Sequence, residues 1–175
     1  MFRTILIEDN ISILPTSKDH LTSLYMATNK KYTNRIIPNE GIGIRVKEIK
    51  KINGKELVEG CYIIYLEFIL ITYKLFKDEI VEATIIKQDE NGIYLMHSIV
   101  NTIHVKILFP GTVKKYFVMK DSPEKHMCWC WTYKNDNFYF KNGQFVRCKI
   151  VHVSYTPFLV EARMDDNGLG PKEWW

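Results

Sequence analysis

The chain has 175 residues, of which 46% are hydrophobic and 25% charged, and its formal net charge is +4. This length and composition fit one or two globular domains and exclude a disordered chain. The charge is too small to establish a nucleic-acid partner by itself.

The N-terminal half is predicted to contain one helix behind a first strand. The strand is expected over Phe2–Glu8. The helix is expected to begin at Thr16 or Ser17, to carry Asp19 at its positive end, and to stop before Pro38. One face of this helix collects the apolar side chains Leu21, Leu24, Tyr25, Tyr32 and Ile36.

The longest apolar run, Cys61–Phe76, is predicted to be a strand with two apolar faces. It is too short for a membrane span and contains charged residues. An alternating strand precedes it from Ile42 to Val46, and Asn53–Gly60 is predicted to be a loop. Because one helix covers only one face of a sheet, a second domain or a partner chain is expected to cover the other face.

The C-terminal half contains only strand signals, which predict a small barrel or sandwich. The boundary is placed between residues 77 and 78, giving domains 1–77 and 78–175. The expected strands are Ile80–Lys87, Ile93–His97, His104–Phe109, Lys115–Met119, Met127–Tyr133, Phe138–Phe140 and Phe145–Val153.

No catalytic constellation is apparent, so the sequence predicts a protein that is not an enzyme and needs no cofactor. The histidines are scattered, and no nucleophile, phosphate-loop or zinc-protease motif occurs. His126, Cys128 and Cys130 could form a metal site, but packing of reduced cysteines as small apolar residues is favoured. Free thiols fit the cytosol or the nucleus.

The stretch ENGIYLMHS has the form of an S1-type RNA-binding signature. In a barrel of the oligonucleotide-binding type, Tyr94 would be a base-stacking residue, and His97 or Lys106 a backbone contact. Arg147 and Lys149 share one face of a later strand and are added to this set. The alternative is that Tyr94 lies in the core and the cations only solvate the barrel.

The stretch CWCWTYK places Trp129, Trp131 and Tyr133 on one face of a strand. Such an aromatic stripe could be a base-stacking ladder. Packing in the core or against a neighbouring domain is the favoured interpretation.

Several of these segments together resemble one family, the stalk subunits of RNA polymerases, which include the archaeal E subunit and its eukaryotic counterparts. The helix, proline and glycine-strand segment NKKYTNRIIPNEGIGI is similar to theirs, and YKLFKDEIVEATIIKQDENGIYL resembles their inter-domain junction. The strand WCWTY and the ending GLGPKEWW are similar to the RNA polymerase III version. The matching segments follow the family order along essentially the whole chain.

The resemblance implies an α+β fold: an N-terminal antiparallel sheet with one helix, the tip domain, followed by an S1-like OB-fold barrel. It implies a non-catalytic subunit in the nucleus that forms a heterodimer with a second stalk subunit, docks on the polymerase core and its clamp, and contacts nascent RNA. Its role would be initiation on transfer-RNA and 5S RNA genes. No membrane contact is implied.

The resemblance also assigns two groups of contact residues. The expected loop that reaches the polymerase core contains Asn53, Gly54, Lys55, Glu56, Leu57 and Gly60. The interface with the partner or the neighbouring domain contains Tyr65, Ile69, Trp129, Trp131, Trp174 and Trp175. Both terminal tryptophans are expected to be mostly buried, with Gly168 and Gly170 allowing the chain to turn back.

Two alternatives remain from the sequence. The chain could be a stalk subunit of RNA polymerase I or II, or a free S1-domain RNA-binding protein. Free solubility of the first domain would favour the second alternative.

Overall fold

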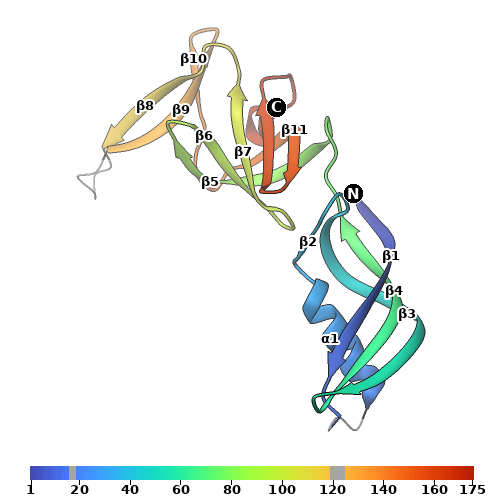
Figure 1. The fold of residues 1–175 in the computed structure, drawn as a ribbon. Coiled ribbons are helices and arrows are strands. Elements are labelled where there is room, and N and C mark those ends of the chain that lie inside the picture. Colours follow the sequence, from blue (N-terminus) through green and yellow to red (C-terminus); the bar gives the residue numbers. More distant parts are fainter. Residues whose placement is uncertain (16–18, 119–124) are drawn as a thin grey trace. The chain divides into compact units, whose positions relative to one another are not determined.

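The computed structural model describes residues 1–15, 19–118 and 125–175. Contacts divide the chain into two compact units, Met1–Lys74 and Leu75–Trp175, and each has its own strands and core. Figure 1 shows the helix of the first unit and the strands of both units.

The first unit is a four-stranded antiparallel sheet with one helix on one face (Figure 1). The strand order is β1-β4-β3-β2. Leu24 of the helix and Leu66, Phe68 and Leu70 of β4 are buried in one core cluster. The elements are β1 Phe2–Ile13, α1 His20–Tyr32, β2 Ile36–Ile37, β3 Gly41–Val58 and β4 Cys61–Tyr73.

The helix is shorter than the sequence predicted at its C-terminal end. It ends at Tyr32, Asn34 has a φ of 57°, and Ile36 belongs to β2 rather than to the helical face. A Cβ on Gly43 would lie 2.2 Å from the carbonyl oxygen of Tyr32. Because β3 approaches the end of the helix this closely, position 43 requires glycine. The chain leaves the helix at Tyr32, well before Pro38.

The N-terminal cap of the helix is Asp19. Its Oδ1 accepts hydrogen bonds from the backbone N–H groups of Leu21 and Thr22, at 3.0 and 3.1 Å. These bonds satisfy two of the donors that the first turn leaves open. The expected caps Thr16 and Ser17 lie outside the described residues.

The predicted loop Asn53–Gly60 is wrong as a loop. Asn53–Val58 continues β3, and only Glu59 and Gly60 form the turn into β4, with φ of 48° and 79°. A two-residue turn with both φ positive matches the twist of a tight hairpin. The Asn and Gly residues had suggested a loop. In the structure, the backbone N–H and C=O groups of this segment are instead satisfied by pairing with β4.

The second unit contains a closed five-stranded barrel, as the resemblance implied; the strand pattern alone had left a barrel or a sandwich open. β7 and β12 run parallel and every other pairing is antiparallel, and β11 pairs with both β5 and β12 to close the ring. This is consistent with an OB-fold. Inward side chains such as Ile93, Leu95, Val105 and Ile150 are fully buried. The barrel strands are β5 Ile80–Asp89, β6 Gly92–His97, β7 Asn101–Leu108, β11 Phe145–Tyr155 and β12 Phe158–Met164.

The sequence analysis missed β12. Its residues do alternate, with Val160, Ala162 and Met164 buried between more exposed neighbours. Glu161 and Arg163 occupy the outward positions of this alternation, so the pattern of a half-buried strand was present in the sequence but was not selected. Without β12 the barrel would be open between β7 and β11.

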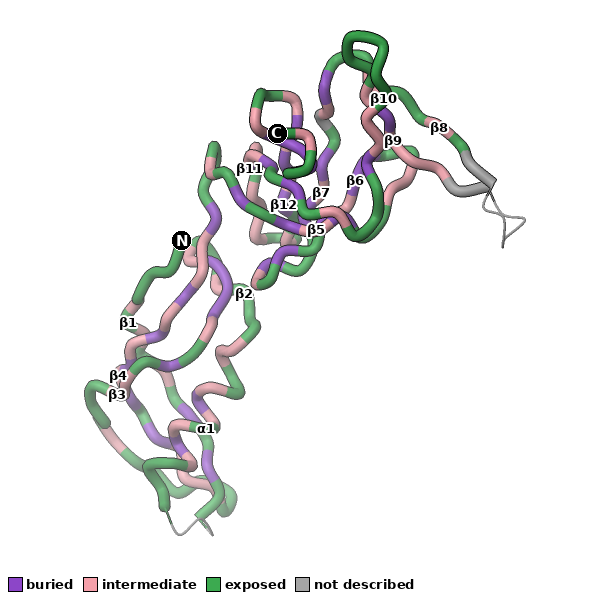
Figure 2. Tube along the Cα trace, turned by 180° about the vertical axis from the view of Figure 1, so that it is seen from behind, coloured by how far each residue is buried: buried purple, intermediate pink, exposed green. Residues whose placement is uncertain are grey.

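Three of the predicted strands lie outside the barrel. β8 Val113–Val118, β9 Lys125–Tyr133 and β10 Asp136–Tyr139 form a separate sheet inserted between β7 and β11, in the order β10-β9-β8. Figure 2 shows that β8 is mostly exposed where its burial is described. Met119, the predicted end of the first of these strands, lies outside the described residues.

Candidate nucleic-acid interface

The outer face of the barrel brings Tyr94 and His104 together on adjacent strands. They are direct cross-strand partners on β6 and β7, and their rings are stacked with centroids 4.5 Å apart and planes 2° apart. Lys87 on β5 pairs with Tyr94 from the opposite side, and its Nζ lies 5.4 Å from the Tyr94 centroid. Tyr94 is therefore half-buried between two neighbours, and does not lie in the core.

His104 is held in place by the turn between β5 and β6. Its Nε2 lies 3.2 Å from the backbone oxygen of Asn91, so the ring donates a hydrogen bond when Nε2 carries the proton. The turn itself is fixed by Asp89, whose Oδ1 accepts from the Asn91 N–H at 2.8 Å. This hydrogen bond lowers the pKa of Asp89, with smaller contributions from Lys87 and Tyr94. Sequence reasoning did not select His104, since only the strand register reveals its contact with Tyr94.

Lys106 lies on the same strand and the same face as His104, so the structure brings it together with Tyr94. It forms an ion pair with Glu161 on β12. The hydrogen bond from Lys106 lowers the pKa of Glu161. The Lys106 side chain remains 53% exposed, which leaves its ammonium group accessible to a phosphate.

His97 does not belong to this surface. It is buried, and its Nδ1 accepts hydrogen bonds from the backbone N–H groups of Ile99 and Val100, at 3.2 and 3.3 Å. Burial lowers the pKa of His97, which favours the neutral ring that these bonds require. The residue stabilises the β6–β7 connection, and we exclude it from the candidate RNA contacts.

Arg147 and Lys149 lie on β11 and both face acidic groups. Arg147 Nε is 3.3 Å from Glu82 Oε1, and Lys149 Nζ is 3.9 Å from Asp78 Oδ1. Lys172 also contacts Glu82, at 2.6 Å, and the hydrogen bonds from Lys172 and then Arg147 lower the pKa of Glu82. These cations form a charge-balanced region apart from the Tyr94–His104 stack.

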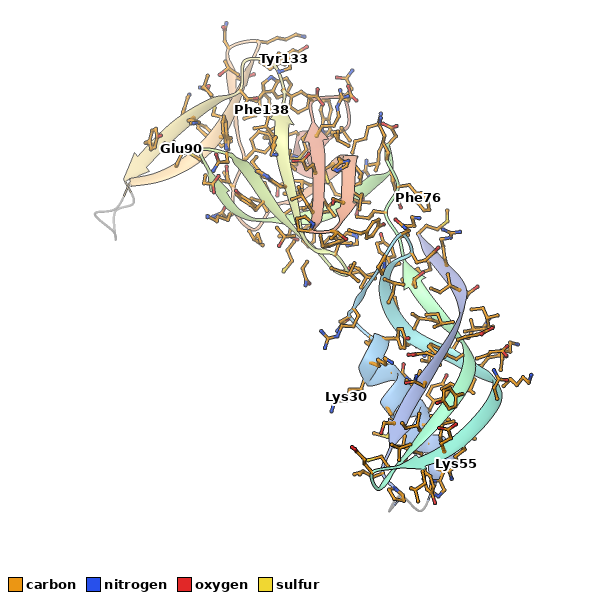
Figure 3. The ribbon with its side chains drawn as sticks, in the orientation of Figure 1. Lys30, Lys55, Phe76, Glu90, Tyr133 and Phe138 are labelled. Atoms are coloured by element: carbon orange, nitrogen blue, oxygen red, sulfur yellow. The ribbon has the colours of Figure 1, made fainter. Side chains whose placement is uncertain are left out.

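The residues expected to reach the polymerase core lie on the β3–β4 hairpin of the first unit. Asn53 donates to Glu67 Oε1 at 2.9 Å, and Lys55 Nζ lies 3.4 Å from the Tyr62 ring centroid. Figure 3 shows Lys55 toward the hairpin end of the sheet. Leu57 is exposed beside the turn. The remaining members of the predicted set are Gly54 and Glu56 in β3 and Gly60 in the turn.

The predicted interface residues of the first unit lie on the sheet face opposite α1. Tyr65 and Ile69 alternate with the buried Leu66 and Phe68 along β4. Tyr65 is exposed and Ile69 is half-buried. The sequence prediction that this strand has two apolar faces therefore agrees with the structure, and α1 covers one of them.

Trp131 and Trp174 pack within the second unit. Trp131 stacks on Phe109 with centroids 4.3 Å apart, and on Trp174 at 5.9 Å. Trp174 also contacts Phe138 and Phe140, at 5.4 and 4.7 Å. We call these five side chains the aromatic cluster; Figure 3 labels Phe138 within it. The chain end thus folds back on its own unit, and packing was the correct interpretation of Trp131.

The expectation that both terminal tryptophans are mostly buried is wrong for Trp175. Its side chain is 58% exposed, although its Nε1 donates to the backbone oxygen of Leu169 at 2.8 Å. Trp174, in contrast, is half-buried and packs beside Phe140. Trp129 is also half-buried, and its Nε1 donates to Asp89 O at 3.2 Å.

All four cysteines are free. Burial raises the pKa of the Cys128 thiol, and raises that of Cys148 to about 12. Within residues 1–15, 19–118 and 125–175, no group of three His, Cys, Asp or Glu side chains is arranged to hold a metal ion. The His126 side chain lies outside the described part, so the structure does not test the alternative metal site.

None of the helices in the described ranges combines the length and apolar character that crossing a bilayer requires.

No family model matches the chain. Over 161 residues the chain is 24% identical to the DNA-directed RNA polymerase III subunit rpc8 of Dictyostelium discoideum. The match covers 90% of this chain and 61% of the relative, so the chain spans less than two thirds of the relative's length. The resemblance recognised in the sequence is confirmed as a distant homology.

Proposed function

We propose that this chain, a distant homologue of an RNA polymerase III subunit, is a non-catalytic stalk subunit of DNA-directed RNA polymerase III. The observation that carries the proposal is the sequence similarity to the RNA polymerase III subunit rpc8, which extends over 90% of this chain. The tip-like first unit and the OB-type barrel of the second unit agree with the architecture that the resemblance implied. The subunit acts in the nucleus, in initiation on transfer-RNA and 5S RNA genes.

The proposed partners follow from the exposed surfaces of the first unit. A second stalk subunit forms a heterodimer with this chain and covers apolar groups such as Tyr65 and Ile69 on the open sheet face. The β3–β4 hairpin, with exposed Leu57 and Lys55 at its side, contacts core subunits including the clamp of the largest subunit. These surfaces support the proposal because exposed apolar groups gathered on one face mark interaction sites.

In the second unit, the barrel contacts nascent RNA through the Tyr94–His104 stack. Stacked rings on an outer barrel face provide a surface for bases, and Lys87 and Lys106 beside them provide charge for phosphates. The face of the second and third strands is the usual ligand face of an OB-fold. No metal or cofactor takes part in this proposal.

Co-purification tests the assembly. The chain is tagged at its native locus and isolated at moderate salt, and the recovered proteins are identified by mass spectrometry. We expect the largest subunit of RNA polymerase III and a second small stalk subunit. Recovery of the largest subunit of polymerase I or II, or of a lone monomer, would reject the proposal in favour of the corresponding alternative.

Binding of labelled single-stranded RNA to the full chain tests the RNA surface. Tyr94→Ala is expected to weaken binding about tenfold, as loss of one stacked base contact predicts. Tyr94→Phe keeps the ring and should bind nearly as well as the unmodified chain. Equal affinities of all three would exclude Tyr94 from the RNA contact.

A further inference from the structure

Phe145 is an exposed aromatic side chain next to the proposed RNA surface. It is 65% exposed and, among the described residues, contacts no other ring. It points outward from β11, since its neighbour Val146 is fully buried in the barrel. Within the described part of the second unit, the Phe145 ring is therefore left mostly uncovered.

Phe145 shares the outer face of the barrel with Tyr94. Phe145 pairs with Thr84 of β5, and Thr84 pairs on its other side with Met96 of β6. Met96 lies two residues from Tyr94 on the same face of β6, and it is also exposed. The spacing between strands and the rise per residue place the Cα atoms of Phe145 and Tyr94 about 12 Å apart. The two rings therefore lie within the footprint of one short oligonucleotide on an OB-fold, about 4–16 nucleotides.

The two rings differ in how far they are already occupied. His104 stacks on Tyr94, and Lys87 approaches the Tyr94 ring from β5. A base that stacks on Tyr94 must displace one of these neighbours or stack on the outer side of His104. Phe145 has no such neighbour, so its ring face can accept a base without rearrangement.

The backbone that carries Phe145 is held in a fixed position. The Gln144 side chain accepts a hydrogen bond from the Lys141 N–H at 2.7 Å and donates to Glu173 Oε2 at 3.0 Å. The Gly143 N–H donates to Ile85 O at 2.7 Å, and the Ile85 N–H donates to Gln144 O at 3.0 Å. The position of the Phe145 Cα is therefore fixed on the barrel, so a base that stacks on the ring orders only the side chain.

A groove next to Phe145 supplies polar and charged groups. It is lined by Lys141, Asn142, Gln144 and Lys172, together with Glu82 and Glu173. Lys172 is already paired with Glu82, and both ends of the Gln144 amide are bonded within the chain. Lys141 forms no ion pair among the described residues, so its ammonium group can contact a phosphate. An aromatic face beside such groups fits a single-stranded nucleotide better than an apolar peptide.

We propose that Phe145 is a second base-stacking position, which extends the RNA path from the Tyr94–His104 stack across β5 to the groove beside β11. This inference rests on the proposed RNA contact of the barrel. It assigns a longer single-stranded RNA as the ligand, bound by two separate aromatic positions on one face.

The test measures binding of the full chain to a uridine trimer and a uridine dodecamer, both labelled with fluorescein. Phe145→Leu keeps an exposed apolar side chain and removes the ring. It is expected to weaken binding of the dodecamer about five- to a hundredfold, the range for one lost base stack, and to leave trimer binding unchanged. Phe145→Trp keeps a stacking ring and should preserve dodecamer binding.

Tyr116→Leu is the matched control, because Tyr116 is an exposed aromatic residue of the same unit on β8, outside the barrel. It should leave dodecamer binding unchanged. Ultraviolet crosslinking of a dodecamer that contains 4-thiouridine, followed by peptide mapping, should identify the peptide around Phe145.

The outcomes separate the two proposals. If Tyr94→Ala weakens dodecamer binding and Phe145→Leu does not, the second stacking position is wrong and the RNA surface at Tyr94 stands. If the unmodified chain does not bind the dodecamer, both proposals fail. A loss in Phe145→Leu equal to the loss in Tyr116→Leu would also reject the second stacking position.

Discussion

The two units of this chain bury their apolar residues in different ways. The barrel of the second unit closes on itself, so the inward side of every strand is covered by the other strands. The sheet of the first unit is open: α1 covers one face, and Phe2 and Leu6 on the other face are 58% and 59% exposed. A closed barrel completes its own core, whereas an open sheet with two apolar faces leaves one face for a partner.

This comparison predicts that the two units unfold separately, and the sequence provides a way to observe it. All four tryptophans, at positions 129, 131, 174 and 175, lie in the second unit. Tryptophan fluorescence therefore follows only the barrel unit, while far-ultraviolet circular dichroism follows both.

The largest loss of stability is expected from a substitution on the sheet face that α1 covers. Phe68 is fully buried and its ring meets that of Tyr32 at 5.1 Å. Phe68→Ala should lower the free energy of unfolding of the first unit by about 3–5 kcal/mol. In urea, the dichroism transition should move to lower concentration while the fluorescence transition stays in place.

Leu6→Ala is the matched change on the uncovered face. Leu6 is exposed, so its loss should change the free energy of unfolding by less than about 0.5 kcal/mol. If the chain assembles with a second stalk subunit as proposed, the same substitution should reduce recovery of that subunit. A large destabilisation of the isolated chain would mean that this face is already covered within the chain.

A smaller effect is expected where the chain end packs on the second unit. Trp174→Ala removes the residue that contacts Trp131, Phe138 and Phe140. It should cost about 2–4 kcal/mol, and the fluorescence transition should move. Trp175→Ala should cost only about 1 kcal/mol, because mainly one hydrogen bond is lost. Equal costs would contradict the different burial of the two tryptophans.

The contact of α1 with β1 depends on pH through Asp9. Tyr32 Oη donates to Asp9 Oδ2 at 2.5 Å, and Lys31 Nζ lies 2.5 Å from the same oxygen. Burial alone would raise the pKa of Asp9, but the hydrogen bonds from Lys31 and Tyr32 outweigh it and lower the pKa. The carboxylate therefore stabilises the fold above its unfolded-state pKa near 4, and this is lost as pH falls through the folded-state pKa.

Asp9→Asn should accordingly destabilise the first unit at neutral pH by about 1–2 kcal/mol. The difference from the unmodified chain should shrink as the pH is lowered toward 2, when the native carboxyl group is also protonated. Urea unfolding followed by circular dichroism at several pH values measures this. A difference that stays constant with pH would show that the Asp9 charge does not stabilise the unit.

A small loss of stability is also expected at the helix cap. Asp19→Ala removes the acceptor for the Leu21 and Thr22 N–H groups and should slightly lower the urea midpoint of the first unit. Asp19→Ser supplies another capping oxygen and should recover most of this loss. Since the cap belongs to the first unit, the fluorescence transition of the barrel should not move in either variant.

Local patterns were sufficient to predict much of the fold and part of the site. The strand Ile93–His97 was predicted, and of the two alternatives for Tyr94 the structure supports the outer face, between the buried Ile93 and Leu95. The candidate site was less complete: Lys106 does accompany Tyr94, but His97 is buried, and His104 was not selected. Which residue on β7 meets Tyr94 depends on register, which no single strand specifies.

The sequence by itself determined the helix, the two-faced apolar strand β4 and a β-rich second half, because these depend on local periodicity and capping. Only the tertiary structure decided that Asn53–Val58 pairs as a strand, that β12 closes the barrel, and that β8, β9 and β10 stand apart from it. It also decided that Trp174 packs, half-buried, against Phe140 while Trp175 remains exposed. These outcomes depend on which distant residues pair and pack, and such contacts leave no periodic signal within one segment.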